Sequence, residues 1–219
     1  MFVPQTIIEP FRVKVVEPLP QLTREERVTE LIKAKYNVFT VPAATVTIDL
    51  MTDSGTSAMS QDQWGAMMRG DESYAGARSF YRFRDKVQEL TGMEHIIPTH
   101  QGRAAEKILF SSVGGKGKFI PANTHFDTTR ANVEFTGAVA VDLVIEEGLK
   151  PENEHPFKGN IDTKRLDAFL HEHEGNVPMV LLTVTNNSGG GQPVSLENIR
   201  EASQVCKRHN IPLLLDCAR

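Results

Sequence analysis

Helix-like and strand-like segments alternate along the chain from residue 80 to its last residues, with short connections between them. We predict helices at 80–90, 101–112, 162–174 and 195–209, and strands at 118–121, 138–145, 177–185 and 211–216. Alternation of this kind is typical of an α/β fold with a mostly parallel sheet and right-handed crossovers. The near-continuous apolar run at 177–185 further indicates a buried strand that is covered on both faces.

The first 56 residues follow a different pattern. Prolines interrupt the stretch 1–20, and a helix is predicted over about 23–34 because Thr23 and Glu26 form a capping pair. Apolar and polar residues then alternate at 45–51, which predicts a strand, and another helix is predicted around 61–68. We therefore expect an arm and partial small domain at 1–56, followed by the main α/β domain at 57–219.

The charge of the chain argues against a nucleic acid or a membrane as its partner. The 219 residues carry a formal net charge of −4, and the Lys and Arg residues are scattered rather than clustered. The longest apolar runs are far too short to cross a bilayer, and the first 20 residues contain no apolar signal segment. With only Cys206 and Cys217, the sequence indicates a soluble cytoplasmic protein that binds a small molecule.

Asp216 has the most informative position in the sequence, because it ends the apolar run at 211–215. The carboxyl ends of parallel strands form the edge at which α/β proteins bind ligands. A carboxylate at that edge can hold a protonated pyridine nitrogen. We therefore expect Asp216 to lie in a ligand site.

Gln101, Gly102 and Arg103 start the helix predicted at 101–112. A helix N-terminus presents unpaired N–H groups and positive partial charge, glycine lets a ligand approach the backbone, and arginine adds a charged donor. These residues would hold a phosphate well. An ordinary helix start with a surface arginine would use the same residues, so this segment does not decide between the two by itself.

Three further loops contain side chains suited to a ring-shaped ligand. Phe126 follows a predicted strand and could stack on a heteroaromatic ring, while Asp127 could contact a substrate; taken alone, a core phenylalanine and a helix-capping aspartate are the simpler interpretation. Asn187 lies in a glycine-rich loop after another predicted strand, where a flexible turn would need similar residues. Tyr74 lies in a polar loop and could carry a proton, or it could be a surface aromatic residue.

Six motifs give these separate signals a common meaning. They are residues 9–12 (EPFR), 48–56 (IDLMTDSGT), 70–76 (GDESYAG), 98–103 (PTHQGR), 157–160 (FKGN) and 190–195 (GGQPVS). Together they closely resemble the β-eliminating lyase family, which contains the tryptophanases and the tyrosine phenol-lyases. The resemblance extends over nearly the whole chain.

The resemblance implies a pyridoxal 5′-phosphate (PLP) enzyme of fold type I, similar to aspartate aminotransferase. Residues 57–219 would form the first part of its cofactor-binding large domain. The cofactor contacts that the resemblance implies are Gln101, Gly102 and Arg103 on the phosphate, Phe126 on the ring, Asn187 and Arg219 near the phenolic oxygen, and Asp216 on the ring nitrogen. The other implied roles are substrate binding by Thr52 and Ser54, proton relay by Tyr74, and a potassium ion held partly by Gly55 and Glu72. The resemblance also implies a homotetramer.

The reaction that the resemblance implies is α,β-elimination on an aromatic amino acid, with release of ammonia and pyruvate. Asp127 favours L-tryptophan as the substrate and indole as the leaving group. Tryptophanases have Asp after the stacking Phe where tyrosine phenol-lyases typically have Thr, and a carboxylate can accept the indole N–H. Tyrosine is the alternative substrate.

Two groups that the family reaction requires are expected beyond this sequence. In the family, the lysine that carries the cofactor and an arginine for the substrate carboxylate follow the strand of Asp216, whereas this sequence ends at Arg219. We therefore expect a truncated chain that is inactive alone. The alternative of a different class is a non-catalytic fragment that serves cofactor binding or assembly.

Overall fold

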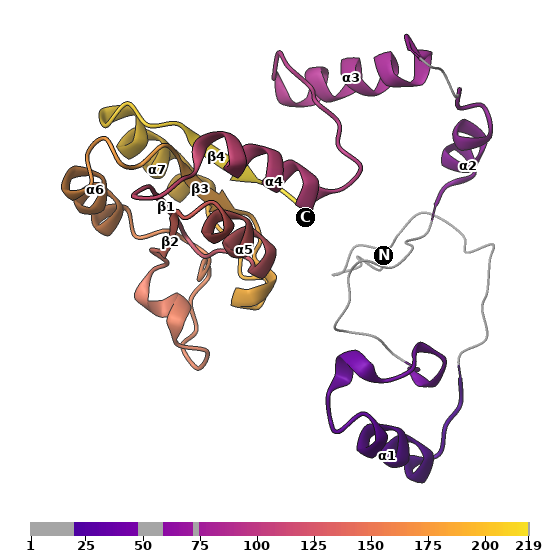
Figure 1. The fold of residues 1–219 in the computed structure, drawn as a ribbon. Helices are drawn as coiled ribbons and strands as arrows, with labels where there is room; N and C mark the ends of the chain where they lie inside the picture. The colour runs from indigo at the N-terminus through magenta and orange to yellow at the C-terminus, as the bar shows by residue number, and fades with distance from the viewer. Residues whose placement is uncertain (1–19, 48–58, 72–74, 219) are drawn as a thin grey trace, which may run out of the picture. The chain divides into compact units, whose positions relative to one another are not determined.

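The computed structural model describes residues 20–47, 59–71 and 75–218 (Figure 1). Contacts between residues divide the chain into two compact units, Met1–Glu94 and His95–Arg219. The domain boundary predicted after residue 56 lies outside the described residues, so that boundary stays a prediction.

The second unit is an α/β domain built on a parallel sheet (Figure 1). Its elements are α4 Gly102–Val113, β1 Phe119–Ala122, α5 Asp127–Phe135, β2 Val139–Asp142, η3 Glu146–Leu149, α6 Thr163–Glu172, β3 Val180–Thr183, η4 Asn187–Gly189, α7 Leu196–Arg208 and β4 Leu213–Asp216. The strand order is β2-β1-β3-β4, and each neighbouring pair is parallel. The predicted α/β class and parallel sheet are confirmed.

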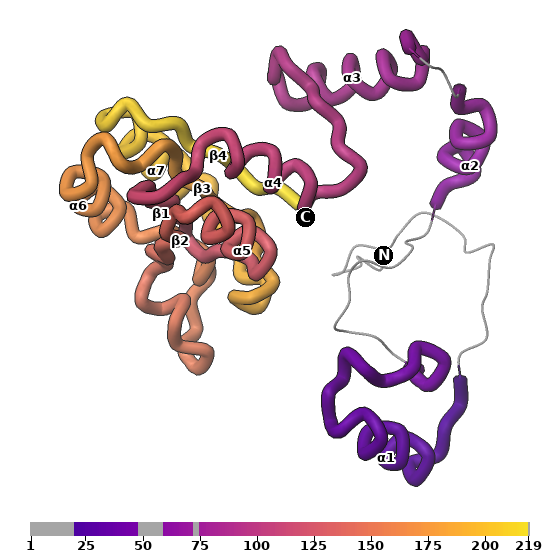
Figure 2. The backbone as a smooth tube through the Cα atoms, in the orientation of Figure 1, coloured from indigo at the N-terminus to yellow at the C-terminus, as the bar shows by residue number. Residues whose placement is uncertain are grey.

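Two apolar clusters, one on each face of the sheet, form the core of this unit. Helices α6 and α7 pack on one face through Leu166 and Val205, and helices α4 and α5 pack on the other through Phe110 and Val133. Strand β3 runs between these helix layers (Figure 2). All four of its residues are buried, which confirms the prediction of a strand covered on both faces.

Helices α6 and α7 begin at side-chain caps, Asp162 and Ser195, where the sequence predicts their starts. Leu196, an apolar residue in the first turn of α7, is 60% exposed. Asn198 is buried instead and exchanges two hydrogen bonds of 2.9 Å with the backbone of Ile161. The Asn198 side chain thus provides hydrogen-bond partners for the buried backbone N–H and carbonyl of Ile161, which lies outside the four strands.

Strand β4 lies at the edge of the described sheet, although its sequence is mostly apolar. Among the described residues it pairs with β3 alone, and Leu215 is 43% exposed. Strands β2 and β3 each span four residues and are shorter than predicted.

Helix α5 is missing from the sequence prediction. Phe126, rather than Asp127, occupies its cap position, and Asp127 is its first helical residue.

The described part of the first unit contains three α-helices and two 3₁₀ turns. They are α1 Arg24–Lys33, η1 Val38–Thr40, η2 Ala43–Thr45, α2 Gln61–Met68 and α3 Arg78–Thr91. The capping pair of Thr23 and Glu26 begins α1 as predicted, and Ser60 with Gln63 forms the same arrangement at α2. Of the strand predicted at 45–51, Thr45 ends η2 and residues 48–51 lie outside the described residues.

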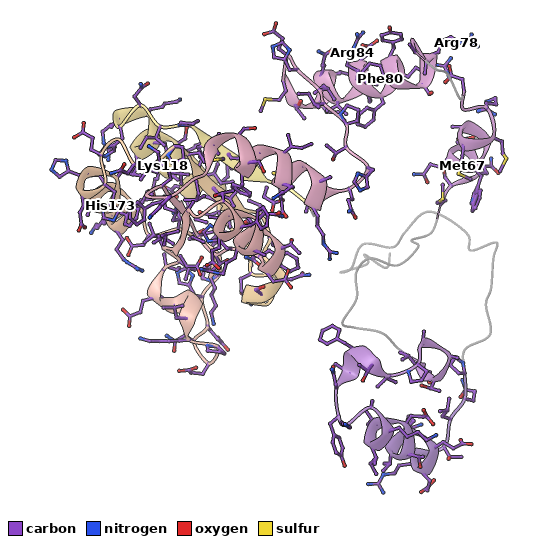
Figure 3. All side chains as sticks on the ribbon, in the orientation of Figure 1. Met67, Arg78, Phe80, Arg84, Lys118 and His173 are labelled. Atoms are coloured by element: carbon purple, nitrogen blue, oxygen red, sulfur yellow. The ribbon has the colours of Figure 1, made fainter. Side chains whose placement is uncertain are left out.

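No described residue of the first unit is buried. Met67 of α2 and Phe80 of α3 carry exposed apolar side chains, and Figure 3 shows them together with Arg84 on the same helix as Phe80. The apolar faces of these helices therefore have no core of their own in the described part of this unit.

Candidate functional site

Three of the predicted site residues stand at the carboxyl ends of neighbouring strands. Asp216 is the last residue of β4, Phe126 follows β1, and Asn187 follows β3. Since β1, β3 and β4 are parallel neighbours, their carboxyl ends meet at one edge of the sheet. The fold therefore brings these three residues to the same edge.

The Asp216 carboxyl group is half-buried, and no described residue forms an ion pair with it. Burial raises the pKa of this carboxyl group and the nearby Glu106 carboxylate raises it further, while a hydrogen bond with the Ala218 backbone acts in the opposite direction. The ionised form of Asp216 is therefore less stable here than in water, and a cation beside it would stabilise it. A carboxylate in this environment is suited to receive a positively charged group.

The first turn of α4 is open to an anion. Gln101 occupies the cap position in extended backbone, the described residues supply no side-chain cap, and Gln101 and Arg103 are both exposed. A Cβ atom added to Gly102 would meet no atom within 4 Å. The N–H groups of this turn are thus accessible, which suits the predicted phosphate site. Glu106, one turn further along α4, is near enough to Asp216 for its charge to act on that carboxyl group.

Two buried asparagines hold the loops after β1 and β3 together. The Asn123 side chain accepts a 2.9 Å hydrogen bond from the Thr183 N–H and donates one of 3.0 Å to the Thr183 carbonyl. The Asn186 amide donates to the carbonyl and to the hydroxyl of Thr124, both at 2.9 Å. These hydrogen bonds fix the two loops that carry the predicted ring-binding residues.

His125 is a buried imidazole directly before Phe126. Its backbone N–H and its Nδ1 lie 2.9 and 2.7 Å from Oδ1 of Asp142, and Arg130 donates to Oδ2 of the same carboxylate at 2.6 Å. Burial raises the pKa of Asp142, but the hydrogen bonds from His125 and the charges of His125 and Arg130 outweigh burial and lower it. This link is not among the predictions from the sequence, although His125 is a titratable residue in the loop that follows β1.

The side chains that would face a ligand differ in exposure. Phe126 is half-buried, whereas Asp127 is exposed and its carboxylate accepts the N–H of Thr128 at 2.5 Å. Asn187 is exposed in η4, and Asn186 accepts the N–H of Ser188 in that turn at 2.9 Å. The predicted stacking residue is therefore less exposed than the predicted polar contacts.

The remaining predicted site residues lie outside the described residues, and their roles stay predictions. They are Thr52, Ser54, Gly55, Glu72, Tyr74 and Arg219. Within the described ranges, His, Cys, Asp and Glu form no group of three or more that could hold a metal ion. No helix in this part of the chain is long and apolar enough to cross a lipid bilayer.

The family model of the β-eliminating lyases matches residues 49–219. The chain belongs to the β-eliminating lyase family. The matched range includes every site residue predicted from the sequence. The resemblance seen in the motifs is thereby confirmed at the level of the family.

Curated relatives include both kinds of lyase within this family. The chain is 59% identical to a tryptophanase of Salinibacter ruber over 98% of its own length and 45% of that protein. It is 58% identical to a tryptophanase of Rhodobacter capsulatus over 98% of its length and 47% of that protein. It is 45% identical to a tyrosine phenol-lyase of Symbiobacterium over 96% of its length and 46% of that protein. The chain thus spans about half the length of these relatives.

Solved structures agree with the fold. A complex of SepCysS with the N-terminal domain of SepCysE matches with a TM-score of 0.52 at 20% identity, over 70% of this chain and 40% of that chain. A PLP-bound C-S lyase of Staphylococcus hominis matches with a TM-score of 0.51 at 14% identity, over 71% of this chain and 39% of that chain. At these identities the likeness concerns the fold alone, and it confirms the predicted fold-type-I architecture over part of those chains.

Proposed function

We propose that this chain supplies the cofactor-binding part of a PLP-dependent lyase that acts on an aromatic amino acid, most favourably on L-tryptophan. The carrying observation is Asp216, a half-buried carboxylate without a described ion-pair partner at the end of a parallel strand. Membership of the β-eliminating lyase family supports the reaction class. The likeness to a PLP-bound lyase supports the cofactor.

The described residues fit PLP. The first turn of α4, with Gln101, Gly102 and Arg103, offers uncapped N–H groups and a guanidinium to a phosphate. The side chain of Phe126 would cover one face of the ring, and the amide of Asn187 would approach the phenolic oxygen. Phe126 and Asn187 follow strands that end at the same edge of the sheet as Asp216.

When bound, the pyridine ring supplies an electron sink for the charge left after the Cα proton of the substrate is removed. Asp216 would keep the ring nitrogen protonated, because a cation beside this carboxylate relieves the cost of its burial. Phe126 would exclude water from the ring face, and Tyr74 would carry a proton. Arg219 would assist Asn187, while Thr52 and Ser54 would orient the substrate.

Tryptophan is favoured over tyrosine by two observations. Asp127 is exposed at the start of α5, where its carboxylate could accept the indole N–H. The chain is also closer to the tryptophanases, at 59% and 58% identity, than to the tyrosine phenol-lyase at 45%. The products would then be indole, pyruvate and ammonia. Potassium binding by Gly55 and Glu72 and assembly as a homotetramer in the cytoplasm belong to the same proposal.

The complete protein with added PLP tests the proposal. We expect release of indole and pyruvate in equal amounts from L-tryptophan, and much slower release of phenol from L-tyrosine. Asp216→Asn should lower kcat by at least about a hundredfold, because a neutral amide no longer keeps the ring nitrogen protonated. Arg200→Ala, an exposed change on α7, is the control and should leave kcat unchanged.

The outcomes separate the alternatives. If phenol from L-tyrosine is the main aromatic product, the substrate is tyrosine and not tryptophan. Bound PLP with neither indole nor phenol released would favour a non-catalytic cofactor-binding module. The 219-residue chain alone should release no product, since the cofactor-carrying lysine of the family is expected beyond Arg219.

A further inference from the structure

Thr183 has a buried hydroxyl group that the fold itself does not use. The residue is 4% exposed, and its Oγ1 has no hydrogen-bond partner among the described residues. Its backbone N–H and carbonyl are both satisfied by Asn123. Leaving a hydroxyl unpaired in the interior costs stability, and a valine of similar shape would avoid that cost.

The register of the sheet puts this hydroxyl beside Asp216. Thr183 and Asp216 are direct partners in the parallel pair of β3 and β4, so their side chains project from the same face of the sheet at neighbouring positions. Two residues earlier, Leu181 and Leu214 occupy the same face and pack with Phe110 of α4. The Thr183 and Asp216 side chains thus lie on the face that α4 and α5 cover.

Glu106 adds a fixed negative charge to this face. It lies one turn before Phe110 on α4, and its two carboxylate oxygens accept hydrogen bonds from Thr129 Oγ1 at 2.5 Å and Asn132 Nδ2 at 3.1 Å. Both donors belong to α5, so the carboxylate is held in place by its neighbours. An ionised Asp216 therefore has a like charge near it. A hydrogen-bond donor on another neighbouring residue would stabilise the Asp216 carboxylate.

We propose that Thr183 is a positioning residue for the ring nitrogen of the cofactor: its hydroxyl donates a hydrogen bond to the Asp216 carboxylate when Asp216 is paired with that nitrogen. This inference rests on the proposed function. One carboxylate oxygen would face the ring nitrogen, and the other would accept from Thr183. The unpaired hydroxyl then costs stability in the free protein and gains its partner in the complex with PLP.

The test compares Thr183→Val with Thr183→Ser in the complete protein. The probes are PLP and 1-deazapyridoxal 5′-phosphate, in which carbon replaces the ring nitrogen. We expect Thr183→Val to leave the Tm of the cofactor-free protein unchanged or to raise it, and to weaken PLP binding by about tenfold, the effect of losing one hydrogen bond to a charged group. Thr183→Val should bind the deaza analogue with the same affinity as the wild type does. Thr183→Ser keeps the hydroxyl and should bind PLP with the affinity of the wild type.

Each other result overturns the inference. Equal PLP affinity in the wild type and Thr183→Val would remove the role of the hydroxyl, and equal weakening for PLP and the analogue would indicate a packing role. If the wild type binds PLP and Thr183→Val gives one of these two results, only this inference is overturned. A wild type that fails to bind PLP overturns the proposed function as well.

Discussion

The amphipathic helices of the two units differ in what covers their apolar faces. In α6 of the second unit, Leu166 and Leu170 are fully buried against the sheet. In α3 of the first unit, Phe80, Phe83 and Leu90 form a stripe at helical spacing, yet they are 38%, 49% and 72% exposed. Periodicity thus specifies a helix and its apolar face, whereas burial depends on another element that contacts this face.

The substitution Phe110→Ala in α4 is expected to lower the free energy of unfolding the most. Phe110 is 1% exposed and packs with Val133 and Leu181, so its loss leaves a cavity in the core. We expect the free energy of unfolding of the second unit to fall by about 3–5 kcal/mol. Urea unfolding followed by far-UV circular dichroism measures it. A fall below about 1 kcal/mol would show that this core is looser than the structure describes.

The sequence predicted the helices well because their signals are local. Helices α6 and α7 begin and end within two residues of the prediction, since their caps and their apolar spacing are local features of the sequence. Helix α5 was missed because its buried face is not apolar throughout. Thr129 is fully buried there and bonds to Glu106 of α4, a contact that no periodicity encodes.

The sheet and the site were predicted only in part, because they depend on contacts between elements that are distant in the sequence. Phe126, Asn187 and Asp216 could be assigned to one edge, because parallel strand ends meet there. The edge position of β4 depends on which strands pair, so its partial exposure could not be read from its apolar residues. Thr183 gained its significance only from its register with Asp216.

A smaller effect is expected for Asp142→Asn, which tests whether polar links at the carboxyl edge also stabilise the second unit. Asp142 bonds to His125 and Arg130 but is partly exposed, so we expect a loss of about 1 kcal/mol at pH 7. Because the pKa of Asp142 is lowered in the folded state, its contribution is complete above the ordinary value of 3.8 and is lost as the pH falls through the folded pKa.

Unfolding in urea at pH 7, 5 and about 3 measures this difference between the wild type and Asp142→Asn. The difference should shrink between pH 5 and about 3. The control is Glu89→Gln in α3, whose exposed pair with Lys86 should contribute nothing measurable. A difference that grows between pH 5 and about 3 would contradict the lowered pKa of Asp142.

The smallest effect is expected for Phe83→Ala in α3, the counterpart of Phe110→Ala in α4. The Phe83 side chain is about half exposed and belongs to a helix with no buried residue, so its removal creates no cavity. We expect the free energy of unfolding of this chain to change by less than about 0.5 kcal/mol. Far-UV circular dichroism follows the helices, and the fluorescence of Trp64, the single tryptophan, reports on the first unit. A loss above about 2 kcal/mol would mean that another element covers the α3 stripe, which would remove the contrast between the two units.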